Sequence, residues 1–178
     1  MNKKGDIWVS AILYFGLGII VIAILLAAGL PVINKLKDKN ITTQTRTAFH
    51  VLDQNIREVL NGGPGTQRIV TLNLKKGEFR IDKESEEIIW NYRNSKVFLS
   101  EPNGIAVKDG KIDVITTKGT TKGTYDITLK LNYGDLANIN PDGTGKITTI
   151  SGLGDVVIRN GGIDTNPERI VLAIDEAR

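Results

Sequence analysis

The hydrophobic positions of the chain form two patterns that meet near residue 35. The first is a run from Ile7 to Ile33 without a charged residue, in which 22 of 27 residues are apolar. At 1.5 Å per residue, a helix of this length spans about 40 Å, more than the hydrocarbon core of a bilayer at about 30 Å. The run therefore predicts one membrane-spanning or filament-core helix over residues 6–34.

The second pattern is a stripe of residues at spacings of three to five, which predicts that the helix continues over residues 35–61 as an amphipathic one. The stripe consists of Leu36, Ile41, Thr45, Ala48, Leu52, Ile56 and Val59. Pro31 lies at the junction, where it removes a backbone hydrogen bond and is expected to kink or break the helix. The sequence Asn61-Gly62-Gly63-Pro64-Gly65 ends the helix.

Short alternating segments separated by turn residues follow, and they predict β-strands. The Asp109-Gly110 pair predicts a hairpin, and Lys75-Lys76-Gly77 a second one. Residues 152–154, a Gly-Leu-Gly sequence, are interpreted as a loop. The expected strands are residues 68–74, 78–82, 87–92, 96–100, 105–107, 111–116, 124–133, 146–150, 155–159 and 169–174.

These elements predict an α+β fold. A long hydrophobic N-terminal helix precedes an antiparallel β-rich domain over residues 66–178, which packs on the C-terminal half of the helix as a sandwich or a rolled sheet. The apolar stripe of residues 35–61 is expected to lie against one face of that sheet.

Composition excludes several kinds of chemistry. The 178 residues contain no Cys and one His, His50, so thiol nucleophiles, zinc–thiolate centres and multi-His metal sites are disfavoured. No catalytic residue and no cofactor are expected, and the protein is not expected to be an enzyme. The net charge is only +3, and the basic residues are interleaved with acidic ones, so nucleic-acid binding is not expected either.

Two short polar motifs are weak candidates for binding or modification. Asn138, Asn140 and Asp142 resemble the first half of a calcium loop, but Thr149 stands where a bidentate Glu would close the cage. A plain turn between strands is the preferred interpretation. Asn40 begins an Asn-x-Thr sequon directly after the apolar run, and its nearness to a helical bundle argues against a glycan.

The N-terminal flank carries a more specific motif. Lys3, Lys4, Gly5 and Asp6 stand directly ahead of the apolar run, and this order resembles the class III signal peptide of type IV pilin-like proteins, archaeal pilins in particular. The resemblance implies that a prepilin peptidase recognises Lys3 and Lys4 and cuts after Gly5. Residues 1–5 would then be the leader, and the apolar helix would stay in the mature protein.

The resemblance covers about the first 35 residues and departs from the family at two positions. Bacterial type IV pilins usually carry Glu at the fifth mature position, which is Ser10 here. Many archaeal pilins begin the mature chain with Gln, where this chain has Asp6. A cleaved secretory signal ending at Ala27-Ala28-Gly29 is the alternative for this segment, although its apolar run is longer than such signals have.

The resemblance implies a structural protein: a subunit that resides in the cell membrane and then assembles, through its apolar helix, into a helical filament on the cell surface. The implied partners are other copies of the chain, a prepilin peptidase, a membrane platform protein and an assembly ATPase. The alternative is a single-pass membrane protein whose extracellular β-domain binds a surface, a glycan or an envelope protein without polymerising.

Overall fold

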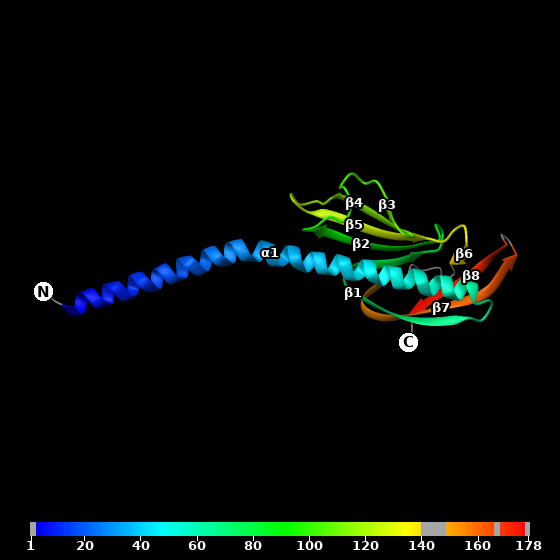
Figure 1. The fold of residues 1–178 in the computed structure, drawn as a ribbon, viewed down its shortest axis with the longest axis horizontal. Helices are drawn as coiled ribbons and strands as arrows, with labels where there is room; N and C mark the ends of the chain where they lie inside the picture. Colours follow the sequence, from blue (N-terminus) through cyan, green and yellow to red (C-terminus); the bar gives the residue numbers. More distant parts are fainter. Residues whose placement is uncertain (1–2, 140–148, 166–167, 177–178) are drawn as a thin grey trace. The chain divides into compact units, whose positions relative to one another are not determined.

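The computed structural model describes residues 3–139, 149–165 and 168–176, and it has the expected α+β layout. Within these ranges one helix, α1 (Lys3–Asn61), precedes eight strands (Figure 1). The chain divides into two compact units, Met1–Lys37 and Asp38–Arg178, so the helix segment from Asp38 onward is part of the β-rich domain. The helix runs through Pro31 without interruption, so this proline does not end it.

The strands form a single eight-stranded sheet in the order β3-β4-β5-β2-β1-β7-β8-β6. All pairs are antiparallel except β6 with β8. Of the two arrangements that the sequence left open, a sandwich and a rolled sheet, the single sheet supports the rolled one. The strands are β1 (Gln67–Asp82), β2 (Glu87–Ser95), β3 (Val107–Asp109), β4 (Ile112–Lys118), β5 (Tyr125–Asn132), β6 (Ala137–Ile139), β7 (Thr149–Thr165) and β8 (Glu168–Glu176).

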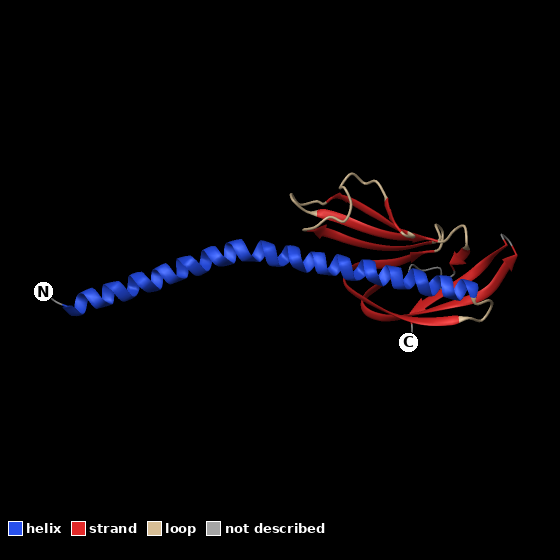
Figure 2. Ribbon diagram, in the orientation of Figure 1, coloured by secondary structure: helices blue, strands red, loops and turns tan. Residues whose placement is uncertain are grey.

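The core lies between α1 and the sheet, whose strands gather around the domain part of the helix (Figure 2). Leu52, Ile56 and Val59 are fully buried and Ile41 is 3% exposed, which confirms the apolar stripe from Ile41 onward, and Phe49 is fully buried as well. Leu36, the first residue of the predicted stripe, is 61% exposed, so its inclusion was wrong. The buried residues of the helix meet buried side chains from β1, β2, β4, β5, β6, β7 and β8, and Phe49 contacts the ring of Phe79 edge-on at 6.1 Å between centroids.

The predicted hairpin at residues 75–77 is wrong. Residues 67–82 form one strand, β1, which pairs with β7 through Gln67–Leu74 and again through Phe79 and Arg80, and with β2 through Glu78–Asp82. Gly77 has a φ of +93°, and the register with β7 shifts between Leu74 and Phe79. The turn residues therefore form a bulge that bends a continuous strand instead of reversing it.

The predicted strand at residues 96–100 is also wrong, because local contacts turn the chain there. The Ser95 hydroxyl donates to the Val97 carbonyl at 2.8 Å and accepts from the Val97 N–H at 3.1 Å. The Lys96 N–H donates to the Asp38 carboxylate at 2.8 Å, so it is not available to a neighbouring strand.

The C-terminal strands are longer than predicted. The expected loop at residues 152–154 lies within β7, where Gly152 and Gly154 pair with Leu74 and Leu72. This loop prediction is wrong, because ladder hydrogen bonds need only backbone groups, which glycine retains. The Asp109-Gly110 hairpin is confirmed with a one-residue shift, since its two loop residues are Gly110 and Lys111.

Candidate functional site

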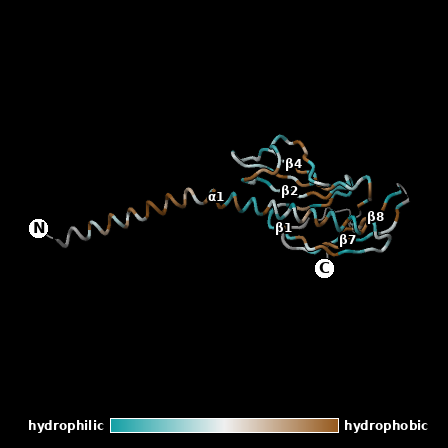
Figure 3. Tube along the Cα trace, in the orientation of Figure 1, coloured by the Kyte–Doolittle hydropathy of each residue, from teal (hydrophilic) through white to brown (hydrophobic). Residues whose placement is uncertain are grey.

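The apolar part of α1 is the most exposed hydrophobic surface in the described chain. From Trp8 to Leu36 its large apolar side chains are 47–75% exposed. Figure 3 shows hydrophobic colour over much of this segment, interrupted by paler turns. None of its most apolar 18-residue stretch is buried. Helix α1 is therefore long and apolar enough to cross a membrane. A helix that is apolar on all sides needs lipid or other helices around it.

Glycines interrupt the exposed apolar surface of α1, and no packing contact within the described chain requires them. A Cβ atom added at Gly16, Gly18 or Gly29 would meet no atom within 4 Å, so intrachain packing does not require glycine there. Glycine is unfavourable in a helix interior, and small residues allow two membrane helices to approach closely. These positions are suited to contact with another helix.

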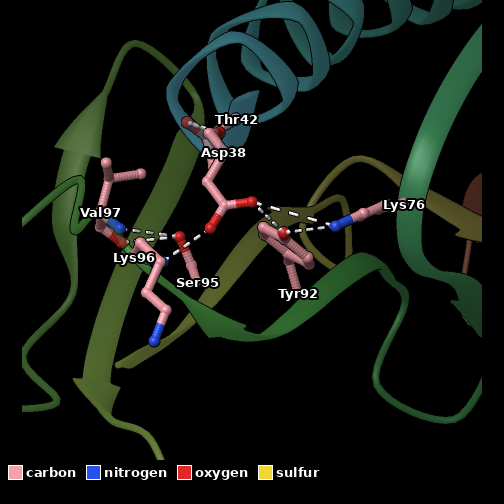
Figure 4. A network of polar contacts seen from close by, with 7 residues as sticks. All are labelled: Asp38, Thr42, Lys76, Tyr92, Ser95, Lys96 and Val97. Atoms are coloured by element: carbon pink, nitrogen blue, oxygen red, sulfur yellow. Dashed lines mark hydrogen bonds and ion pairs between the residues drawn. The ribbon is translucent and has the colours of Figure 1, made fainter. Parts of the chain in front are cut away.

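A buried polar network begins where the helix enters the domain (Figure 4). Asp38 is only 6% exposed. One carboxylate oxygen, Oδ1, accepts a hydrogen bond from the Tyr92 hydroxyl at 2.6 Å, and the other, Oδ2, accepts from the Lys96 N–H at 2.8 Å. The Lys76 ammonium lies 4.0 Å from Oδ1 and 3.4 Å from the Tyr92 oxygen. The carboxylate is thus bonded to both β2 and the loop that follows it.

The electrostatics of this network fix its donors. Burial raises the pKa of the Tyr92 hydroxyl above its ordinary value, and the neighbouring Asp38 carboxylate raises it further. Tyr92 therefore stays protonated at neutral pH and donates to Asp38. Thr42 supports the same helix turn by donating to the Asp38 and Lys39 carbonyls, each at 3.0 Å.

A second helix aspartate makes a similar contact further along the domain. The Tyr133 hydroxyl donates to Asp53 at 2.7 Å, and Arg57 donates to the other oxygen of the same carboxylate at 2.9 Å. Burial raises the pKa of Tyr133 above its usual range, with Asp53 adding to the effect. Asn160 fixes the end of the helix, because its amide donates to the Val59 carbonyl at 3.2 Å. The helix is thus held by polar contacts at its entry, middle and end.

An exposed charge cluster joins the helix to the β3–β4 hairpin. Asp109 accepts from Arg46 and lies 2.9 Å from the Nε2 atom of His50. The Arg46 hydrogen bond, helped by His50, holds the pKa of Asp109 at about 2, although desolvation acts in the opposite direction. His50 is therefore a surface residue of the helix, with a carboxylate as its partner.

This cluster predicts a small acid sensitivity. The pKa of Asp109 is lower in the folded state than its ordinary value near 3.8. The ionised carboxylate therefore stabilises the folded state above pH 3.8, and this stabilisation is lost as the pH falls toward about 2. Because the ion pair of Asp109 with Arg46 is exposed, we expect it to add less than about 1 kcal/mol to the free energy of unfolding. Urea unfolding of the full chain and of Asp109→Asn should differ at pH 5 and converge near pH 2. A difference that persists at pH 2 would contradict this assignment.

The leader and sequon residues predicted from the sequence all lie on α1. Lys3, Lys4, Gly5 and Asp6 form its first turns, with helical backbone. Asn40 is exposed, but Thr42 of its sequon is fully buried and bonded to the helix backbone. The threonine of the sequon is therefore not accessible in the folded domain.

The weak calcium candidate falls mostly outside the described residues, because Asn140 and Asp142 lie within residues 140–148. Asn138 is described in β6, and its amide donates to the Asp164 carboxylate at 3.3 Å. Within the described ranges, no three His, Cys, Asp or Glu side chains lie close enough together to hold a metal ion.

Asp38 and Tyr92 were not predicted from the sequence as members of a site. A signal for Asp38 was available: it precedes Ile41 by three residues and Thr45 by seven, and therefore lies on the same helix face as the apolar stripe. A charged residue on such a face is buried only with partners. Tyr92 gave no comparable signal, because its alternation in β2 is equally typical of an apolar core position.

The sequence profile of one family, described as a family of unknown function (DUF7289), matches residues 8–122, which are 115 of the 178 residues. The chain belongs to DUF7289. In this DUF7289 chain the match begins inside the apolar helix and ends in the loop after β4, so the family pattern includes most of the apolar helix and the first part of the β-rich domain. No curated protein and no solved structure matches the chain.

Proposed function

We propose that this protein is the structural subunit of a type IV pilus-like surface filament. It would be held in the membrane by its apolar helix, cut after Gly5, and assembled through that helix with the β-domain displayed outside. An apolar helix with exposed side chains, directly behind Lys3-Lys4-Gly5-Asp6, carries this proposal. The proposed partners are other copies of the chain, a prepilin peptidase, a membrane platform protein and an assembly ATPase.

Assembly of this kind is a matter of helix packing. The apolar side chains are surrounded by lipid before assembly and by neighbouring helices afterwards, so little new hydrophobic free energy is gained. Close contact and shape complementarity must then stabilise the filament. Gly16, Gly18 and Gly29, which no contact inside the chain requires, support such a role, because each leaves space for a neighbouring helix.

The N-terminus of the native protein tests the proposal. Mass spectrometry is performed separately on the membrane fraction and on material sheared from cells. We expect a mature chain that starts at Asp6 in the sheared material. An intact or Met-trimmed N-terminus found only in membranes would overturn the proposal in favour of a single-pass binding protein. A start after Gly29 would overturn it in favour of a secreted domain.

Two variants separate cleavage from packing. Gly5→Leu should leave the leader attached and keep the chain out of sheared filaments. Gly16→Leu leaves the cleavage site intact but adds bulk to the helix surface, so this chain should be cut normally and be depleted from filaments. Normal incorporation of both variants would contradict a filament assembled through this helix.

A further inference from the structure

The loop between β4 and β5 lies at the end of the domain where the helix enters. Asp38 binds the Lys96 N–H, as described above, and Asn94 precedes Lys96 by two residues. The Asn94 side-chain oxygen accepts hydrogen bonds from the hydroxyls of Thr120 at 2.9 Å and Thr124 at 3.1 Å. These contacts place the loop, residues 118–124, close to the first domain residue of α1.

This loop has the composition of an anion site. Its sequence is Lys-Gly-Thr-Thr-Lys-Gly-Thr, and together with Tyr125 it lines a hollow of about 250 Å³. Within the described residues, no protein acceptor receives the backbone N–H groups of Thr121, Lys122 and Gly123. Consecutive free N–H groups beside cationic side chains are the groups that bind phosphate oxygens.

The loop is held in shape by its neighbours. The Gly119 N–H donates to the Thr124 carbonyl at 2.9 Å, and the Thr124 N–H donates to the Thr121 carbonyl at 3.0 Å. Asn94 has a φ of +56° and orients its side chain toward the threonine hydroxyls. A Cβ atom at Gly119 would lie 2.5 Å from the Thr124 hydroxyl, so the loop needs glycine there.

The charge at this end of the domain is mainly basic. Lys39, Lys96, Lys118 and Lys122 are all exposed. The acidic groups nearby are already bonded: Asp38 is buried in its network, and Asp126 accepts from the Asn94 N–H at 2.8 Å. Basic side chains remain available for an anionic partner.

Chain connectivity identifies that partner. The continuous series of exposed apolar residues of α1 ends at Leu36, two residues before Asp38. Two residues of helix rise about 3 Å, so the chain connects the basic end of the domain directly to the apolar segment. Lysines close to a membrane are attracted to anionic lipids. A hollow of about 250 Å³ is smaller than the pocket of a drug-sized ligand and suits a headgroup whose acyl chains stay in the bilayer.

We propose that the loop of residues 118–124 binds the phosphate of an anionic lipid headgroup, with Lys96 and Lys39 adding attraction, while the protein resides in the membrane. The inference rests on membrane residence, which is one part of the proposed function, and not on leader cleavage or filament assembly. It would orient the domain against the bilayer before assembly.

Amide NMR of the full chain in nanodiscs tests the inference. Nanodiscs of phosphatidylcholine are compared with nanodiscs containing phosphatidylglycerol, and the signals of Thr121, Lys122 and Gly123 are followed. We expect these signals to shift only with phosphatidylglycerol. Lys118→Gln with Lys122→Gln should weaken the apparent affinity for this lipid about fivefold per lysine, or about 25-fold together.

The matched control is Lys83→Gln with Lys111→Gln, which removes the same charge. Lys83 lies in the turn before β2 and Lys111 in the turn before β4, at the opposite ends of these strands from Lys96 and Lys118. If the two double variants weakened the affinity for phosphatidylglycerol equally, general charge attraction would explain the binding and the proposed site would be wrong. Equal shifts with inorganic phosphate in phosphatidylcholine nanodiscs would overturn the lipid as its source. If Gly5→Leu did not block assembly, the filament proposal would fail, but the lipid-dependent shifts of Thr121, Lys122 and Gly123 would not be affected.

Discussion

Replacing Asp38 by Ala is expected to lower the free energy of unfolding of the domain by about 3–5 kcal/mol. The substitution removes the acceptor of the Tyr92 hydroxyl and of the Lys96 N–H, which are now 2.6 and 2.8 Å from the carboxylate oxygens. Tyr92 is 7% exposed, so water replaces this acceptor poorly. The free donors, more than the lost contacts themselves, account for most of the expected change.

Urea unfolding of the full chain in detergent, followed by near-ultraviolet circular dichroism, measures this effect. Asp135→Ala is the control, because Asp135 is exposed and its removal should change stability by less than about 0.5 kcal/mol. Tyr92→Phe removes the donor and should cost about 1–2 kcal/mol alone, but less in the Asp38→Ala background. A loss below about 1 kcal/mol for Asp38→Ala would show that the network does not hold the helix.

The helix could be predicted from the sequence in considerable detail because its signals are local. Its end at Asn61 and its buried stripe follow from residue spacing and from the glycines after it. The 3.6-residue period needs no knowledge of the partner surface. The same spacing placed Thr45 in the interior, where it is 1% exposed.

The sheet was predicted less well because its geometry depends on residues far apart in the chain. Residues 75–77 form a bulge and not a turn because β1 pairs with β7, which lies about 80 residues further along the chain. The parallel partner of β8, the three-residue β6, is too short for a periodic signal. Short apolar runs and isolated glycines are compatible with both turns and strands until the pairing is known.

The candidate sites show the same division. The apolar helix, long enough to cross a membrane, follows from composition alone, whereas the Asp38 network joins residues 38, 76, 92 and 96 through tertiary contacts. The loop of residues 118–124 has a visible Lys-Gly-Thr repeat, but its place beside the helix entry depends on Asn94. Local composition identifies what a segment could bind, and the fold determines where it does so.

Gly77→Ala is expected to destabilise the domain by about 3–4 kcal/mol. The glycine has a φ of +93°, which alone costs an L-residue about 1–2 kcal/mol. An added Cβ would also lie 2.4 Å from the Trp90 Nε1 atom and 2.7 Å from the Asn91 carbonyl oxygen. Trp90 is fully buried and donates to the Lys76 carbonyl at 3.0 Å, so the ring cannot move aside without losing that bond.

Gly104→Ala is the matched control, because Gly104 has a similar φ of +78° but its added Cβ would meet only Thr117 Cγ2 at 3.6 Å. This variant should lose about 1–2 kcal/mol, so the difference between the two measures the steric conflict at the bulge. Urea unfolding followed by Trp90 fluorescence, in a Trp8→Phe background, gives both values. Equal losses would mean that β1 can shift to admit a side chain at residue 77, and that the close fit of Trp90 does not fix the bend of the sheet.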